Sequence, residues 1–108
     1  MSQPNPPLDN LVREYLDSSK NETEAPIFGL LFEYLNHLYE DVEEPILLED
    51  FSALEVDDFL NFFLDDKFPD DKNLKITSKK TLKNFFQYLL KKNMIHKEEI
   101  KEWKEALK

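Results

Sequence analysis

A single glycine in 108 residues constrains the fold of this chain more than any other feature of its sequence. β-Sandwiches and β-barrels depend on tight turns with positive φ angles, which glycine adopts at the least cost. The scarcity of glycine therefore argues against both architectures. It also excludes the glycine-rich loops that bind phosphate, because each of those motifs needs two or three glycines. Nine phenylalanines, four tyrosines and one tryptophan are too many for a disordered chain, so we expect a folded protein.

Apolar residues recur at helical spacing in five segments, and no segment alternates over the length of a strand. The pattern predicts helices over residues 8–20, 26–40, 53–66, 78–92 and 97–107. We therefore expect an all-α fold, a compact bundle of four main helices with a C-terminal fifth helix. Residues 1–7 contain three prolines and are expected to form a flexible leader, and residues 8–108 a single helical domain.

The third predicted helix begins with a capping motif. Ser52 and Glu55 have the spacing of a capping box, in which each side chain accepts a hydrogen bond from a free backbone amide at the start of the helix. Seven apolar side chains of this helix are expected to face the core: Leu54, Val56, Phe59, Leu60, Phe62, Phe63 and Leu64.

Residues 65–75 are polar and are predicted to form a loop long enough to be mobile. Thr77 or Ser78 would then cap the fourth helix. Asn93 is expected to end that helix in the left-handed conformation, with Lys91 and Lys92 favourably placed at its negative end.

The formal net charge of −9 is divided unevenly along the chain. Residues 1–71 carry 19 acidic and three basic side chains, a net of −16, whereas residues 72–108 carry 11 lysines and four glutamates, a net of +7. Such a division indicates an acidic or a basic interaction surface. The alternative is that acidic and basic helices pack side by side and neutralise each other.

Neither catalysis nor metal binding finds support in the residue pattern. Cysteine is absent, which removes thiolate ligands and nucleophiles. His37 and His96 are isolated, whereas a zinc site needs three or four ligands. An acidic cluster lacks the glycine and the bidentate glutamate of a calcium-binding EF-hand loop: Asp65, Asp66, Asp70, Asp71 and Asn73. We expect no enzymatic activity, no cofactor, no metal and no small-molecule substrate.

The sequence also lacks targeting and membrane signals. Residues 1–7 do not combine a basic region with an apolar stretch, as a secretory signal does. Uninterrupted apolar runs reach only three or four residues, far fewer than the roughly 20 that a membrane span needs. We expect a cytoplasmic protein that does not associate with membranes.

The fourth predicted helix carries a polar stripe rich in lysine. Lys79, Lys83, Gln87 and Lys91 recur every four residues, so they lie along one side of a helix. Such lysines can neutralise phosphates, and Asn84 and Gln87 can reach base edges. The alternative is that the lysines only solvate an amphipathic helix. The candidate nucleic-acid-binding residues are Lys79, Lys80, Lys83, Asn84, Gln87 and Lys91.

Four segments share a pattern of aromatic and aliphatic helix positions: residues 32–35 (FEYL), 48–50 (LED), 58–60 (DFL) and 77–89 (TSKKTLKNFFQYL), followed by Met94 and Ile95. Over residues 8–95 the chain resembles the N-terminal core-binding (SAM-like) domain of tyrosine recombinases and phage integrases. The resemblance implies a domain that clamps duplex DNA, with the helix over residues 78–92 against the duplex. The implied contacts are Lys79, Lys80, Lys83, Gln87 and Lys91.

The chain departs from that family in two respects. The arginine-rich surface of the family is replaced by lysines, and the domain is acidic overall. The catalytic domain with its tyrosine nucleophile is missing, so recombinase chemistry is not expected from this chain alone. We expect a non-catalytic DNA-binding module. The alternative is a protein-interaction or adaptor domain that presents its acidic and aromatic surface to a protein partner.

Overall fold

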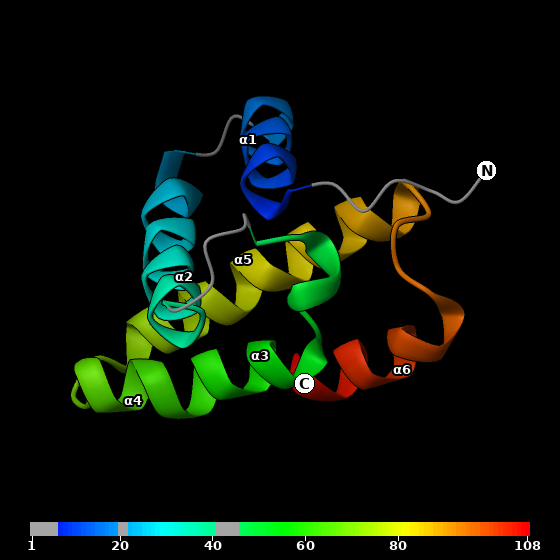
Figure 1. The fold of residues 1–108 in the computed structure, drawn as a ribbon. Helices are drawn as coiled ribbons and strands as arrows, with labels where there is room; N and C mark the ends of the chain where they lie inside the picture. Colours follow the sequence, from blue (N-terminus) through cyan, green and yellow to red (C-terminus); the bar gives the residue numbers. More distant parts are fainter. Residues whose placement is uncertain (1–6, 20–21, 41–45) are drawn as a thin grey trace. The chain divides into compact units, whose positions relative to one another are not determined.

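A computed structural model describes residues 7–19, 22–40 and 46–108 (Figure 1). Apart from an isolated bridge between Pro7 and Leu47, every regular element in these ranges is helical, which confirms the all-α fold. The chain divides after Phe51 into two compact units, residues 1–51 and 52–108. The expected leader, except for Pro7, lies outside the described residues. None of the described helices is both long and apolar enough to cross a membrane.

The first unit begins with the amphipathic helix α1 (Leu8–Ser19), which buries Leu8, Leu11, Val12 and Tyr15. These positions follow the i, i+3, i+4, i+7 spacing that places side chains on one face of a helix. A 3₁₀ turn, η1 (Glu22–Glu24), leads directly into α2 (Ala25–Leu38). The ring of Tyr15 meets that of Phe28 edge-on, with centroids 5.8 Å apart, so α1 and α2 share an aromatic core.

The last residues of the first unit run beside the start of α1. The backbone amide of Leu8 donates to the carbonyl oxygen of Ile46 over 2.8 Å. A 3₁₀ turn, η2 (Leu48–Asp50), follows, and the Asp50 carboxylate accepts a hydrogen bond from the amide of Leu47. The hydroxyl of Tyr39 donates to the backbone oxygen of Asp50, which ties this turn to the end of α2.

The second unit opens with one continuous helical segment made of α3 (Ala53–Asp58), the π-helical turn η3 (Phe59–Phe63) and α4 (Leu64–Lys67). This segment confirms the helix expected over residues 53–66. In its widened centre the amide of Leu64 donates to the carbonyl of Phe59, five residues earlier. Such a turn holds one residue more than an α-helical turn and shifts the register of everything after it.

The segment buries only some of the apolar side chains that were expected to face the core. Val56, Phe59, Leu60 and Leu64 are buried as expected, whereas Phe63 is half-buried. The expectation that Leu54 and Phe62 face the core is wrong, since they are 74% and 65% exposed. A helix buries one stripe only, and this segment has more apolar residues than that stripe can hold.

The prediction of a capping box at the start of α3 is wrong, because Ser52 forms a different hydrogen bond from the one expected. Ser52 does occupy the N-cap position with extended backbone angles. Its hydroxyl, however, donates directly to the Glu55 carboxylate over 2.9 Å, and its side chain accepts no amide at the helix start. A hydroxyl bound to an ionised carboxylate forms a stronger hydrogen bond than one between neutral groups, which explains the preference.

Helix α5 spans Lys72–Lys91, so the expected start at residue 78 and the expected loop over residues 65–75 are wrong. Asp71 caps the helix by accepting the amide of Leu74 over 2.9 Å. Thr77 and Ser78 therefore lie inside the helix rather than at its cap. An aspartate is as strong an N-cap as a serine, and this one lies six to seven residues earlier.

The expected end of α5 at Asn93 is confirmed. Asn93 has a φ angle of 56°, and its amide donates to the carbonyl of Leu90. The amide of Met94 donates to the carbonyl of Leu89. This pair of bonds is a Schellman motif, which satisfies the free carbonyls at a helix end.

The last helix, α6 (Lys97–Ala106), confirms the helix expected over residues 97–107. Trp103 is almost fully buried and stacks on Phe86 of α5, with centroids 5.3 Å apart. Helix α6 also packs against α3, and its C-terminal end lies beside the N-terminal end of α3 (Figure 1). The core of the second unit is thus built from α3–α4, α5 and α6.

Candidate nucleic-acid interface

Helix α5 separates an apolar side from a basic side. Its buried residues are Ser78, Thr81, Leu82, Phe85, Phe86 and Leu89. Over its 20 residues it carries six lysines and no acidic side chain. The lysines do not share the buried stripe, so the spacing that buries the aromatic rings turns the ammonium groups outward. One element therefore positions the whole basic surface.

The candidate residues lie together on the outer side of this helix. Lys80, Lys83, Asn84, Gln87 and Lys91 are exposed, and Lys79 is half-buried. From Lys79 to Lys91 the stripe is about 18 Å long, at 1.5 Å of rise per residue. That length matches the rise of roughly five base pairs of a duplex. We call Lys75, Lys79, Lys80, Lys83 and Lys91 of α5 the lysine face.

The N-terminal half of the lysine face surrounds a shallow hollow of about 300 Å³. Its lining residues are Lys75, Ile76, Lys79, Lys80 and Lys83. Ile76 is 65% exposed, so an apolar side chain lies among four ammonium groups. The candidate residues chosen from the sequence omit Lys75, because the helix was expected to begin later. Lys75 lies four residues before Lys79 and eight before Lys83, and this spacing could have identified it from the sequence.

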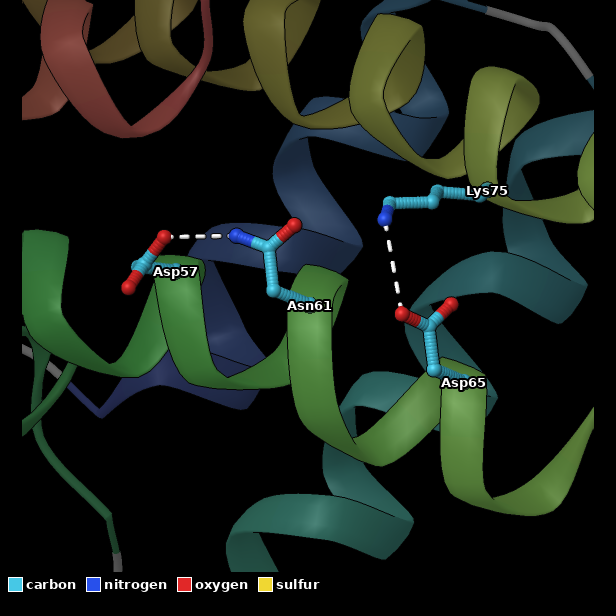
Figure 2. Close-up of polar contacts among 4 residues, drawn as sticks. All are labelled: Asp57, Asn61, Asp65 and Lys75. Carbon is cyan, nitrogen blue, oxygen red and sulfur yellow. Dashed lines mark hydrogen bonds and ion pairs between the residues drawn. The ribbon is translucent and has the colours of Figure 1, made fainter. Parts of the chain in front are cut away.

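Two lysines of this face already have partners. Lys75 reaches from α5 to Asp65 on α4, where Nζ and Oδ2 are 3.5 Å apart (Figure 2). Lys79 donates through Nζ to the backbone oxygen of Lys108. By contrast, Lys80, Lys83 and Lys91 form no ion pair with any residue in the described ranges. Among the described residues, three ammonium groups of the face therefore take part in no ion pair.

A polar row on the helical segment α3–α4 accompanies these contacts. Asp57, Asn61 and Asp65 recur every four residues and point to the same side of the segment (Figure 2). The Nδ2 group of Asn61 donates to Oδ1 of Asp57 over 2.6 Å. The Asp65–Lys75 pair neutralises one lysine at the edge of the lysine face. Part of the expected mutual neutralisation of acidic and basic helices is therefore present.

The acidic excess of the whole protein does not belong to the unit that contains α5. Residues 52–108 carry 11 acidic and 12 basic side chains, a net of +1. Residues 1–51 carry 12 acidic and two basic side chains, a net of −10. The lysine face is consequently a local basic surface on a nearly neutral unit.

Groups suited to metal binding are not assembled in the described part of the chain. No three His, Cys, Asp or Glu side chains come close enough there to hold a metal ion. Within the acidic cluster, Asp65 pairs with Lys75 and Asp71 caps α5. His37 is exposed beside Glu40, and His96 precedes α6 without capping it through its side chain.

No protein-family model, no curated protein and no solved structure matches the chain.

Proposed function

We propose that this chain is a non-catalytic helical module that binds duplex DNA through its lysine face. The observation that carries the proposal is that α5 exposes Lys80, Lys83 and Lys91 without an ion pair to any described residue. The helix itself has no carboxylate to compete with a phosphate. The resemblance of the sequence to recombinase core-binding domains supports the same helix as the contact surface.

The chemistry of the lysine face favours the phosphate backbone over the bases. Each ammonium group that neutralises a phosphate releases condensed counterions, so binding is strong at low salt and weak at high salt. Lysine is a point charge and lacks the planar fork with which arginine recognises guanine. Exposed Asn84 and Gln87 add amide groups that can reach base edges, so the expected sequence preference is small.

The overall charge of −9 does not prevent this mode of binding. At physiological ionic strength, charges separated by more than about 8 Å are largely screened. A local row of ammonium groups therefore acts on a phosphate at contact distance, whereas distant carboxylates slow the approach. The unit that bears α5 has by itself a net charge of only +1, so it adds no acidic excess of its own.

The test is a fluorescence anisotropy titration of a labelled random duplex of about 20 base pairs at low salt, a length that exceeds the stripe several times. The test variant combines Lys80→Glu, Lys83→Glu and Lys91→Glu on α5. The control variant combines Lys97→Glu, Lys101→Glu and Lys104→Glu, three exposed lysines of α6. Both variants change the net charge equally, so they separate the position of the charges from their sum.

We expect the α5 variant to lose at least about tenfold in affinity and the α6 variant to bind nearly as the wild type does. Far-UV circular dichroism should be the same for all three proteins, because the reversed lysines are exposed. An equal loss of affinity in both variants would show that binding depends only on the net charge of the protein. Absence of binding by the wild-type protein at low salt would refute the proposal.

A further inference from the structure

A second surface of the unit 52–108 has the opposite character to the lysine face. Helices α3 and α6 pack against each other, and a groove of about 710 Å³ opens between them. Its lining includes Ala53, Leu54 and Asp57 of α3 and Glu102, Glu105 and Ala106 of α6.

Apolar side chains give the groove its shape. Ala53 is buried and Ala106 is half-buried, so small side chains line the place where the two helices meet. Leu54, at the side of the groove, is 74% exposed. An exposed leucine beside a groove gives a partner an apolar surface to cover, which scattered surface leucines do not.

Carboxylates dominate the rim of the groove. Asp57, Glu102 and Glu105 face a single ammonium group, that of Lys101. Glu102 and Glu105 are exposed and form no ion pair within the described ranges. Asn61 holds Asp57 through Oδ1, which fixes the carboxylate and leaves Oδ2 for another donor (Figure 2). The rim therefore offers three anionic groups, one of them already oriented.

We infer that this groove binds a short amphipathic helix of a basic protein partner. An apolar residue of the partner would cover Leu54 and enter the groove, and lysines or arginines one turn before and after it would pair with the rim. The charge of the rim excludes nucleic acid from this surface, just as the charge of the lysine face excludes basic partners from that one. The lysine face and the groove are tested by different variants, so DNA binding and peptide binding can each be refuted without the other.

The probe is a labelled amphipathic peptide of about 16 residues built from leucine and lysine in a helical pattern, titrated against the full chain. A second peptide replaces every lysine by glutamate. Leu54→Ser removes the apolar contact, and the pair Glu102→Gln and Glu105→Gln removes the rim charge. Phe62→Ser, an exposed aromatic outside the groove, and Glu98→Gln, an exposed glutamate of α6, are the matched controls.

We expect Leu54→Ser to weaken binding of the leucine–lysine peptide about tenfold, as an apolar anchor does. Neutralising Glu102 and Glu105 should weaken it about twofold to fivefold for each exposed pair lost. Both controls should bind as the wild type does, and the leucine–glutamate peptide should not bind. In ¹H–¹⁵N spectra of the full chain, the amides that shift should lie in α3 and α6.

Three results would overturn the inference. Equal affinities of the groove variants and their controls would show that the groove is not the site. Shifts confined to residues 1–51 would show that the peptide follows the net charge of −10 of that unit instead. Concentration-dependent sedimentation that Leu54→Ser abolishes, without peptide binding, would assign the groove to a second copy of this chain.

Discussion

The hydroxyl of Tyr15 donates to Glu24 and lies 2.9 and 3.0 Å from the two oxygens of its carboxylate. Tyr15 belongs to α1, and Glu24 is the last residue before α2, so this pair joins the two helices of the first unit. Both residues are buried. Burial raises the pKa of the Tyr15 hydroxyl well above its ordinary value, and the hydrogen bond to Glu24 and the charge of that carboxylate raise it further.

The raised pKa predicts a loss of stability at alkaline pH. The folded chain keeps the Tyr15 proton while the unfolded chain releases it near pH 10.0, so the stabilisation is complete below pH 10.0 and is lost as the pH rises above it. Chemical denaturation across this range should show the decline. Tyr15→Phe should lower the free energy of unfolding at neutral pH by about 1–3 kcal/mol and flatten the alkaline decline. A decline of the same steepness in the variant would contradict this role of Tyr15.

Much of the fold could be predicted from the sequence, because five amphipathic patterns stand out in a chain with one glycine. The ends of helices were predictable where a residue type has one dominant use, as with Asn93 at the end of α5. The start of α5 was not, since Asp71, Thr77 and Ser78 are all good N-caps and the sequence does not rank them. The π turn at Phe59–Phe63 was also hidden, because the packing around it selects the wide turn.

The candidate site, like the fold, could be predicted from the sequence only in part. The four-residue spacing of Lys79, Lys83, Gln87 and Lys91 was enough to place them on one exposed side of a helix. The pairing of Lys75 with Asp65 could not be foreseen, because it depends on how α4 and α5 meet. The groove beside Leu54 was missed for a related reason. Counting apolar residues assigned Leu54 to the core, but α3 buries one stripe only and Leu54 lies outside it.

Gly29 offers a stabilising substitution. It lies at an exposed position inside α2 with a negative φ angle, and an added Cβ would meet no atom within 4 Å. Alanine reduces the conformational freedom of the unfolded chain and suits a helix interior, so Gly29→Ala should raise the free energy of unfolding by about 1 kcal/mol. Thermal and chemical unfolding measure the gain. An unchanged or lower stability would mean that α2 does not continue through this position.

Asp71 tests the observed start of α5. Asp71→Ala removes the acceptor of the Leu74 amide and should lower the free energy of unfolding by about 0.5–2 kcal/mol. Hydrogen exchange at the amides of the first turn should accelerate at the same time. Asp70→Ala, at the neighbouring exposed position, is the matched control and should change neither measurement. Equal effects of the two substitutions would place the start of the helix elsewhere.

The hydroxyl of Ser78 is buried and has no hydrogen-bond partner within the described ranges. An unsatisfied buried polar group destabilises the folded state, so Ser78→Ala should raise the free energy of unfolding by about 1 kcal/mol. Thr77→Ala, at an exposed position of the same helix, measures the gain that helix propensity alone provides. A gain at Ser78 no larger than that at Thr77 would show that the hydroxyl is hydrogen-bonded in solution.

The salt dependence of DNA binding tests the central claim most directly, because it counts phosphate contacts. The comparison is between the wild-type chain and a variant with Lys80→Gln, Lys83→Gln and Lys91→Gln, which removes three charges without introducing repulsion. Each phosphate contact contributes about −0.9 to the slope of the logarithm of the binding constant against the logarithm of the salt concentration. The slope of the variant should therefore be shallower than that of the wild type by about 2.7. Parallel slopes for the two proteins would contradict the assignment of the lysine face as the DNA-binding surface.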